Sequence, residues 1–128
     1  IFIGRRNIFT SFFMVYVIDD DTNVRSSLEL LLKSYDMRYK SFTSGKEFLE
    51  HYSGSQKGVV ILDLKMADMD ARDFLQRLKD KGIGIPVIGI TANNELHVRE
   101  YCRDFGVTNI MSKPVDSKAL MDIIVYYK

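Results

Sequence analysis

Short apolar runs alternate along the chain with segments whose apolar residues recur at helical spacing. Residues 14–18 are apolar and mostly β-branched. Residues 59–62 are apolar throughout, which is typical of a central parallel strand covered on both faces. Further strands are predicted at 37–42, 86–90 and 109–112. Five strands separated by helical segments indicate an α/β domain with a parallel sheet.

The first two helices have predictable starts. Thr22 or Asn23 is the expected cap of the first helix, and Ser44 with Glu47 three positions later forms a capping box for the second. The inward face of the first helix is predicted to consist of Val24, Leu28, Leu31, Leu32 and Tyr35, and that of the second of Phe48, Leu49 and Tyr52. Both segments therefore have an apolar face that a sheet can bury.

Three more helices follow the third, fourth and fifth strands. The third helix is expected to end near Lys81 and Gly82. The fourth covers residues 96–105 and is closed by Gly106. The last begins at Asp116 or Ser117. Their predicted inward residues are Phe74, Leu75 and Leu78 in the third helix, and Leu120, Ile123, Ile124 and Tyr127 in the last.

The composition suits one globular domain of 128 residues, with 46 % hydrophobic and 27 % charged residues. The net charge of +1 gives no electrostatic reason to expect binding to nucleic acid or a membrane. No apolar run reaches the roughly 20 residues that a membrane-spanning helix needs. Cys102, the single cysteine, is expected to be a small buried residue, and its lack of a disulfide partner favours the cytoplasm.

Residues 1–13 stand apart from this pattern. They are apolar with a basic pair, Arg5 and Arg6, and they lead into the first strand without a small-residue cleavage site. An additional strand or helix, a dimerisation arm and a start-site artefact are all compatible with them. We expect the domain itself to occupy residues 14–128, with residues 1–13 as an extension of unknown role.

Polar residues follow four of the five predicted strands. They are the aspartates at 19–21 after the first strand, Asp63 after the third, Thr91 after the fourth and Lys113 after the fifth. Any one of them is weak evidence, because acidic residues often follow strands as turn or cap residues. In open α/β sheets, however, the carboxyl ends of the strands meet where ligands bind. The joint placement therefore predicts a site at this edge.

The chemistry of this set suits phosphoryl transfer. Clustered carboxylates repel one another, and a hard divalent cation relieves the repulsion; oxygen ligands favour Mg²⁺. The cation would keep Asp63 ionised, so that its carboxylate can attack phosphorus and become an aspartyl phosphate. The Lys113 ammonium and the Thr91 hydroxyl can each stabilise part of the charge on the transferring group.

Four segments carry a resemblance to a known family: residues 15–21, 61–66, 90–92 and 112–114, which read VYVIDDD, ILDLKM, ITA and SKP. In this order and spacing they resemble the receiver domain of response regulators in two-component signalling, from Met14 to about Tyr127. The resemblance implies a flavodoxin-like, doubly wound (βα)5 fold, with a parallel sheet of strand order 2-1-3-4-5 and helices on both faces.

The resemblance also implies roles around the phosphoacceptor, Asp63. Asp20 would be a direct Mg²⁺ ligand and Asp19 would act mainly through water. Asp63 itself and the backbone carbonyl of Lys65 would complete the metal site. Asp21 is expected to be a solvated or capping residue.

Three further positions acquire roles in the same way. Thr91 would hydrogen-bond the phosphoryl group in the active state, and Lys113 would pair with its oxygens. Pro114 would follow a cis peptide bond, which proline allows. Thr91 and Ile110 occupy the positions of the conformational switch.

The chain departs from the family pattern at three places. The loop at 66–71 lacks the usual Pro and Gly after the acceptor, so it is expected to be more mobile or differently bent. Ile110 stands where Tyr or Phe is usual, so an aromatic rotamer coupled to Thr91 cannot be the readout. Lys65 and Asn93 occupy positions that tune autodephosphorylation in the family, and the Lys65 side chain is expected to lie in solvent.

The implied function is a regulatory switch rather than an enzyme. A sensor histidine kinase would phosphorylate Asp63, slow autodephosphorylation would reverse it, and phosphorylation would shift an equilibrium between two conformations. The change is expected on the face made by the fourth helix, fifth strand and fifth helix, which the family uses for homodimers or output contacts. Candidates on that face are Val98, Tyr101, Ile110 and Tyr126. The expected output is transcription, with DNA bound only by an output domain outside this chain.

Three other interpretations are weighed against this one. Residues 19–22, Asp-Asp-Asp-Thr, also fit the Asp-x-Asp pattern of haloacid-dehalogenase-like phosphatases, although Asp63 would then have no role and no second acidic pair follows Lys113. A degenerate receiver that binds partners without phosphorylation is compatible with the altered loop and Ile110. A flavodoxin-like nucleotide binder would need a glycine-rich phosphate loop after the first strand, which the sequence lacks.

Overall fold

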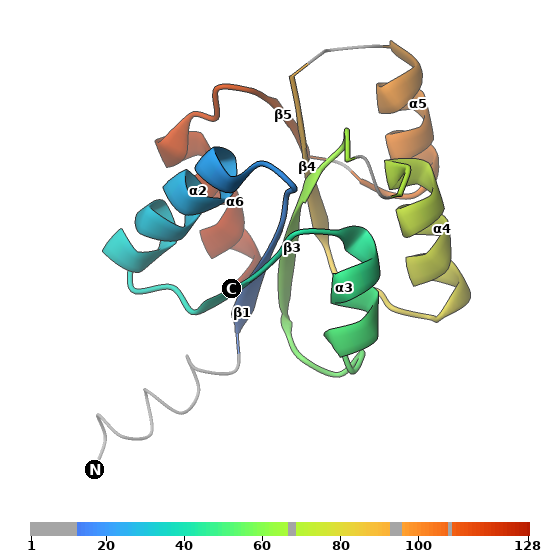
Figure 1. Ribbon diagram of the computed structural model, residues 1–128, viewed down its shortest axis with the longest axis horizontal. Helices are drawn as coiled ribbons and strands as arrows, with labels where there is room; N and C mark the ends of the chain where they lie inside the picture. The colour runs from blue at the N-terminus through green and yellow to red at the C-terminus, as the bar shows by residue number, and fades with distance from the viewer. Residues whose placement is uncertain (1–12, 67–68, 93–95, 108) are drawn as a thin grey trace.

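Five parallel strands form a single sheet in the order β2-β1-β3-β4-β5 (Figure 1). The computed structural model describes residues 13–66, 69–92, 96–107 and 109–128. The strands are β1 (Met14–Ile18), β2 (Tyr39–Phe42), β3 (Gly58–Asp63), β4 (Val87–Thr91) and β5 (Asn109–Ser112). The predicted parallel sheet and its strand order are confirmed.

Helices cover both faces of the sheet, as the sequence predicts. They are α2 (Thr22–Ser34), α3 (Gly45–His51), α4 (Ala71–Asp80), α5 (Leu96–Asp104) and α6 (Ser117–Tyr127). Helices α2 and α6 lie on one face and α3, α4 and α5 on the other (Figure 1). None of the helices in the described part of the chain is both long and apolar enough to span a bilayer.

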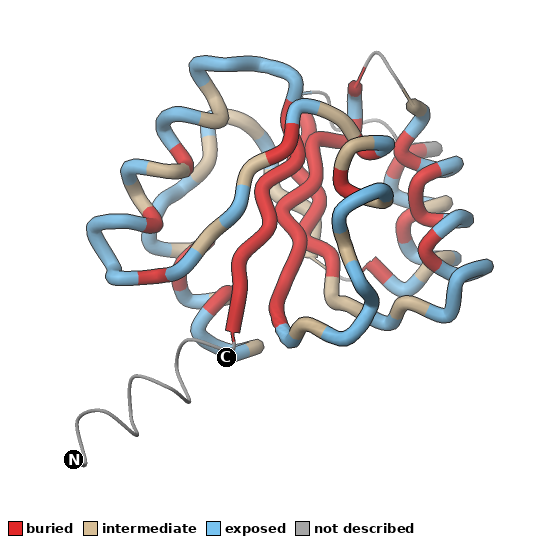
Figure 2. Tube along the Cα trace, turned by 60° about the horizontal axis from the view of Figure 1, so that its bottom comes forward, coloured by how far each residue is buried: buried red, intermediate tan, exposed pale blue. Residues whose placement is uncertain are grey.

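The strands form the most deeply buried part of the molecule (Figure 2). Successive side chains of a strand point to opposite faces, so β1 contributes to two separate cores. Val15 and Val17 pack with the aliphatic residues of α2 and α6, and Phe13 just before the strand joins them. Tyr16 and Ile18 pack under α3, α4 and α5, where aromatic rings gather. The two faces therefore differ in kind: one is mainly aliphatic, the other rich in aromatic side chains.

Helix α2 starts and ends differently from the prediction. Its N-cap is Asp21, whose carboxylate accepts hydrogen bonds from the backbone N–H groups of Asn23 at 2.8 Å and Val24 at 3.2 Å. The capping role expected as one possibility for Asp21 is confirmed, and the other predicted caps, Thr22 and Asn23, lie within the first turn. Tyr35 is 51 % exposed, contrary to prediction, because the helix ends at Ser34 and helical spacing no longer applies.

Other helix ends match the sequence. The Ser44 hydroxyl accepts a hydrogen bond from Glu47 N–H at 3.0 Å, as in the predicted capping box, although the Glu47 carboxylate bonds Thr43 N–H at 3.4 Å rather than the cap itself. Asp116 caps α6 by accepting from Ala119 N–H at 3.0 Å, which decides between the two predicted starts. Cys102 is fully buried, as predicted.

Two strands are displaced from their predicted bounds. Strand β2 begins at Tyr39 rather than residue 37, because Met37 N–H bonds the carbonyl of Leu32 at 3.0 Å and so belongs to the end of α2. Strand β4 covers Val87–Thr91 instead of 86–90. Pro86 has no N–H to donate, but its carbonyl still accepts a bond from Val60 N–H at 2.9 Å. As a result, Thr91 is the last residue of β4 and not the residue after it.

Candidate functional site

The carboxyl edge of the sheet gathers the polar residues that the sequence singled out. Asp19 follows β1, Asp63 and Thr91 end β3 and β4, and Lys113 follows β5. These strands stay paired up to this edge, because Leu64 N–H bonds the Ile90 carbonyl and Lys113 N–H bonds the Thr91 carbonyl, both at 2.9 Å. Among the described residues, Asp19, Asp63 and Thr91 are the only polar ones classed as buried.

Three carboxylates and one ammonium converge there. Asp19, Asp20 and Asp63 each place one carboxylate oxygen within 4.8 Å of the others. Lys113 Nζ lies 3.6 Å from Asp19 Oδ2 and 3.5 Å from Asp63 Oδ2. Asp19 and Asp63 are buried, whereas Asp20 is exposed to solvent. A single lysine thus bridges two buried acids, and a third acid borders them on the open side.

Backbone groups hold one oxygen of each buried acid. Asp19 Oδ1 accepts a hydrogen bond from Asp21 N–H at 2.9 Å, and Asp63 Oδ1 accepts one from Lys65 N–H at 3.0 Å. The other oxygen of each side chain faces Lys113. Each carboxylate therefore has a fixed orientation and one oxygen left for chemistry or for a cation.

The electrostatics of Asp19 indicate an excess of negative charge. Burial is the main reason that the pKa of Asp19 is raised to about 6; the backbone N–H of Asp21 lowers this pKa, the nearby Asp63 raises it and the Lys113 ammonium lowers it. Within the described part of the chain, Asp19 Oδ2 has no hydrogen-bond partner, although it is fully buried. A buried carboxylate oxygen without a hydrogen bond is unfavourable unless a further positive charge is supplied.

These features fit a divalent cation. The site offers three carboxylates, one of them with an unsatisfied buried oxygen, and only oxygen ligands. Hard oxygen ligands and a partly open rim suit Mg²⁺, which uses one or two carboxylates and keeps several waters. The arrangement can therefore hold a Mg²⁺ ion next to Asp63.

The other predicted positions divide into those near the site and those elsewhere. The Lys65 side chain is exposed, as expected, while its backbone follows Asp63 directly. Ile110 is half-buried in β5, and the peptide bond between Lys113 and Pro114 is cis. Val98, a candidate for the outer face, is 5 % exposed and packs in the core, so that expectation is wrong. Residues 67–68 of the loop, Asn93, and residues 1–12 lie outside the described residues.

One contact of the site was not predicted from the sequence. Arg25, in the first turn of α2, donates from Nη1 to the backbone carbonyl of Asp19 at 2.8 Å. The bond ties α2 to the end of β1 and so fixes the loop that carries the three aspartates. Position 25 belongs to no sequence motif. The sequence alone does not distinguish a helical arginine that bonds a backbone carbonyl from one that lies in solvent.

Comparison with known proteins gives a consistent result. Residues 15–125 match the family model described as response regulator receiver domain. The chain is 29 % identical over 110 residues to the transcriptional regulatory protein TdiR of Thauera aromatica, covering 86 % of this chain and 48 % of TdiR. It is 28 % identical over 122 residues to the response regulator protein TmoT of Ectopseudomonas mendocina, covering 95 % of this chain and 56 % of TmoT. The chain thus spans about half the length of these regulators.

A different kind of protein is also similar over the same region. The sensor histidine kinase RcsC of Salmonella typhi is 31 % identical over 114 residues, which cover 89 % of this chain but 12 % of the kinase. Among solved structures, FixJ-N superposes with a TM-score of 0.82 at 28 % identity, covering 90 % of this chain and 92 % of FixJ-N. CheY4 of Vibrio cholerae has a TM-score of 0.80 at 18 % identity, covering 90 % and 98 %, and supports the fold alone.

Proposed function

Because the chain belongs to the response regulator receiver domain family, we propose that it is a switch in which Asp63 accepts a phosphoryl group from the phosphohistidine of a sensor histidine kinase. The observation that carries the proposal is the position of the Asp63 carboxylate, buried, 3.5 Å from Lys113 Nζ and beside two further acids. Family membership decides against the phosphatase and the nucleotide-binding interpretations. The degenerate receiver is the alternative that the experiment below has to exclude.

The proposed transfer uses groups already in place. A carboxylate oxygen of Asp63 attacks phosphorus, and an O–P bond forms while the P–N bond of the phosphohistidine breaks. The electron pair of the broken bond goes to the imidazole nitrogen, and Asp63 becomes an acyl phosphate. The Lys113 ammonium pairs with the phosphoryl oxygens, and the Thr91 hydroxyl donates to another oxygen once the group is bound.

Mg²⁺ would be held by the side chains of Asp19, Asp20 and Asp63 and by the backbone carbonyl of Lys65. When bound, the cation offsets the charge of the acids and of the incoming phosphoryl group. Asp19 Oδ2, buried and without a hydrogen bond in the described part of the chain, supports this assignment. Asp19 and Asp20 then have the same task of keeping positive charge beside Asp63.

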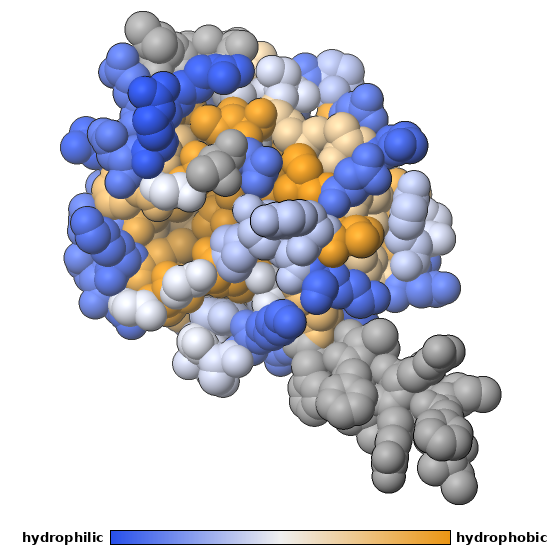
Figure 3. Space-filling view, turned by 180° about the vertical axis from the view of Figure 1, so that it is seen from behind, coloured by the Kyte–Doolittle hydropathy of each residue, from blue (hydrophilic) through white to orange (hydrophobic). Residues whose placement is uncertain are grey.

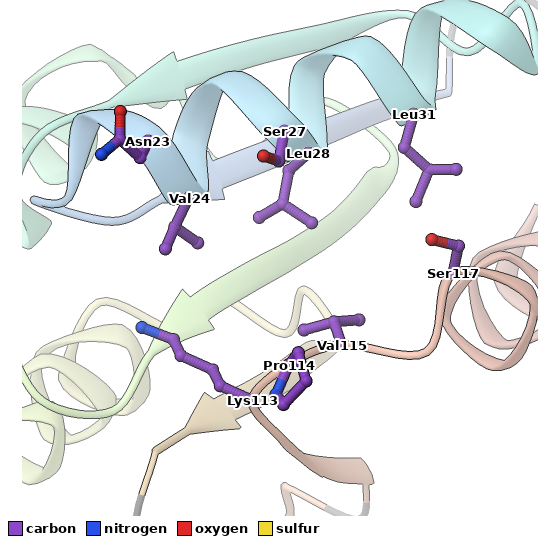
Figure 4. Close-up of a pocket in the computed structure, with 9 residues that line it drawn as sticks. All are labelled: Asn23, Val24, Ser27, Leu28, Leu31, Lys113, Pro114, Val115 and Ser117. Atoms are coloured by element: carbon purple, nitrogen blue, oxygen red, sulfur yellow. The ribbon is translucent and has the colours of Figure 1, made fainter.

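The phosphodonor has a surface to dock on beside the site. A groove of about 570 Å³ lies between α2 and the segment after β5, lined mainly by apolar side chains. Figure 4 shows Val24, Leu28 and Leu31 of α2 directed toward Pro114 and Val115. Lys113 lines one end of this groove and also reaches Asp63, so a protein bound in the groove would lie next to the phosphoacceptor.

We further propose that the signal leaves on the face made by α5, β5 and α6. Tyr126 is 82 % exposed and Val125 56 %, while Tyr101 and Ile110 are half-buried. Several hydrophobic patches lie on the face seen in Figure 3, with paler side chains between them and strongly hydrophilic ones around the edge. A second copy of the chain or an output domain would cover this surface. The transcriptional regulators that this chain resembles match it along about half of their own length. A DNA-binding output domain is expected in such a regulator, and it would lie outside residues 14–128.

The readout at Ile110 would be aliphatic. Ile110 is the register partner of Gly89 in β4, and a methyl group at Gly89 would come within 2.9 Å of Leu64 Cδ1. Leu64 directly follows Asp63, so its side chain connects the phosphoacceptor to the part of the sheet that carries Ile110. We propose that movement of Leu64 replaces the usual aromatic rotamer change.

The reaction would take place in the cytoplasm, where the buried thiol of Cys102 stays reduced.

The decisive experiment is Mg²⁺-dependent uptake of beryllofluoride, a phosphoryl mimic, followed by ¹H–¹⁵N NMR. Uptake is expected in the wild type only with Mg²⁺, and it should vanish in Asp63→Asn. Asp122→Asn, an exposed acid on α6, is the matched control and should bind as the wild type does. A phosphorylated sensor kinase should then transfer its label to the wild type and not to Asp63→Asn.

The remaining outcomes are equally informative. No uptake by a folded wild-type chain would establish a degenerate receiver. Uptake that persists in Asp63→Asn and disappears in Asp19→Asn would move the nucleophile to Asp19 and refute the assignment of Asp63.

A further inference from the structure

A second hollow lies at the outer edge of the sheet, away from the Asp63 site. It has a volume of about 400 Å³ and lies between the edge strand β2, β1 and the end of α3. Helix α3 has seven residues and ends at His51, so the sheet below it is covered by a loop rather than by helix. The residues that line the hollow include Tyr16, Lys40, Phe42, His51, Tyr52 and Gln56.

Aromatic rings form its walls. The ring centroids of Tyr16 and Tyr52 are 5.3 Å apart with nearly perpendicular planes, and those of Tyr16 and Phe42 are 6.3 Å apart. The His51 imidazole lies 6.0 Å from the Phe42 ring. Such edge and face contacts are favourable for a further aromatic ring placed among them.

Tyr16 contributes a hydroxyl group to the lining of the hollow. Tyr16 as a whole is 4 % exposed, and it lines the hollow. Among the described residues, no hydrogen bond involves its hydroxyl. Burial, with a smaller effect of Tyr52, raises the pKa of Tyr16 to about 12, so the hydroxyl stays protonated and can donate. Tyr52, by contrast, already donates to the Gln56 carbonyl at 2.7 Å.

Lys40 supplies a positive charge at the same place. It is the register partner of Tyr16 in the β1–β2 pair, so both side chains point to the face covered by α3. Lys40 is exposed, whereas Tyr16 is buried, and the residues that line the hollow include no Asp or Glu. The hollow thus combines an aromatic floor, the Tyr16 hydroxyl as a donor and the Lys40 ammonium at its rim.

We propose that this hollow binds a small aromatic carboxylate, with its ring against the side of the Tyr16, Phe42 and Tyr52 rings that lines the hollow and its carboxylate paired with Lys40 and the Tyr16 hydroxyl. The volume lies within the range of small-molecule pockets, and a few convergent polar groups in an aromatic setting are the usual means of orienting such a ligand. The charged carboxylate makes the hydrogen bonds stronger than those of a neutral ligand. Binding in this hollow does not require phosphorylation at Asp63.

The site has one connection to the acid cluster. Asp19 N–H donates to the Phe42 carbonyl at 3.2 Å, so a ligand that moves the Phe42 backbone also moves the loop of aspartates. This contact makes the amide of Asp19 a useful reporter, but the proposal stands on binding alone.

The test is an NMR titration of the full chain with benzoate as the probe. Saturable shifts are expected at the amides of Tyr16, Lys40, Phe42 and Tyr52, with a dissociation constant on the order of 1 mM or below. Cyclohexanecarboxylate, which keeps the charge without the aromatic ring, and benzamide, which keeps the ring without the charge, should each bind at least several-fold more weakly. These comparisons separate the aromatic and the ionic parts of the proposal.

Two variants and a matched control complete the test. Lys40→Gln and Tyr16→Phe should each weaken benzoate binding about three- to tenfold. Tyr16→Phe keeps the ring, so its unfolding temperature should match the wild type and a loss of binding cannot be attributed to misfolding. Lys33→Gln, which removes an exposed lysine on the opposite face, should bind as the wild type does.

Three results would overturn the proposal. They are the absence of saturable shifts, shifts that centre on Lys113 instead of the hollow, and equal binding of benzoate to Lys40→Gln and the wild type. Beryllofluoride uptake at Asp63 is expected to be normal in Lys40→Gln, so failure here leaves the proposed phosphoacceptor function untouched.

Discussion

The two ends of the sheet are built from the same five strands but differ in what they bury. The carboxyl end buries Asp19, Asp63 and Thr91. The amino end, as far as the structure describes it, buries only apolar side chains and tightly paired backbone: Phe13 and Met37 are buried there, and Met14 N–H bonds the Lys57 carbonyl at 2.9 Å. The carboxyl end therefore buries charged groups in a low-dielectric setting. The amino end, among the described residues, buries apolar side chains and no charged group.

This difference separates stability from function along the strands. Buried carboxylates destabilise the fold unless they are paired, and the proposed binding of a cation and a phosphoryl group would account for their presence at the carboxyl end. The amino end has no such chemistry to perform and can be optimised for packing. Substitutions should therefore have opposite effects at the two ends: loss of stability at the amino end, and gain of stability with loss of function at the carboxyl end.

The largest effect is expected at the amino end, at Gly58. A Cβ atom there would lie 2.0 Å from the backbone carbonyl oxygen of Met14, its register partner in β1. Neither backbone can move without breaking the β1–β3 pairing, so Gly58→Ala should lower the free energy of unfolding by about 3 kcal/mol or more. Urea unfolding measures this change. Gly84→Ala, at a position where a Cβ meets nothing within 4 Å, should be nearly neutral; a neutral Gly58→Ala would contradict the register.

A smaller effect of opposite sign is expected at the carboxyl end, at Asp19. Because burial raises the pKa of this carboxyl to about 6, its ionisation in the folded state destabilises the protein at neutral pH. Asp19→Asn should raise the free energy of unfolding by about 2 kcal/mol in EDTA. The same variant should lose the stabilisation that Mg²⁺ gives the wild type. Asp122→Asn, on the surface of α6, should leave the Mg²⁺ effect unchanged and alter the free energy of unfolding by no more than about 0.3 kcal/mol.

The pH dependence of this pair follows from the direction of the pKa. Below about pH 3, Asp19 is largely protonated in both the folded and the unfolded state, so ionisation has almost no effect on stability. As the pH rises toward 6, the unfolded state ionises first and the folded wild type loses stability; above about pH 7 the loss is complete. The difference between Asp19→Asn and the wild type should therefore be near zero at pH 3 and largest at pH 7. A difference that is independent of pH would contradict the role of ionisation.

The contrast between the two ends also explains what the sequence could predict. The carboxyl end was predictable because the acids at 19–20, Asp63, Thr91 and Lys113 each follow an apolar run, and the rule for α/β sheets brings those positions together. Strand order followed from the resemblance to the family. Helix caps were partly predictable, because several polar residues near a helix start can satisfy the same N–H groups.

The amino end was harder to predict because it depends on contacts between distant segments. The central strand was predicted at residues 59–62, yet Gly58 is the first residue of β3 and lies opposite Met14 across the sheet. Val98 was a candidate for the outer face that the family uses for contacts, but the position of this face in the sequence does not say how closely α5 packs. Arg25 and the unsatisfied oxygen of Asp19 likewise depend on three-dimensional position and on no local pattern.

The smallest effect tests whether every acid at the carboxyl end is destabilising. Asp116 is exposed there and caps α6 through Ala119 N–H, so it should stabilise the fold, unlike the buried Asp19. Asp116→Ala should lower the free energy of unfolding by about 1 kcal/mol. Asp122→Ala removes an exposed acid of the same helix that lies 3.7 Å from Lys118, and should lower it by about 0.3 kcal/mol. Urea unfolding of both variants compares them directly. Asp116→Ala could instead raise the free energy of unfolding, as Asp19→Asn does. Burial would then not explain why Asp19 is destabilising, because an exposed acid at the carboxyl edge would be destabilising as well.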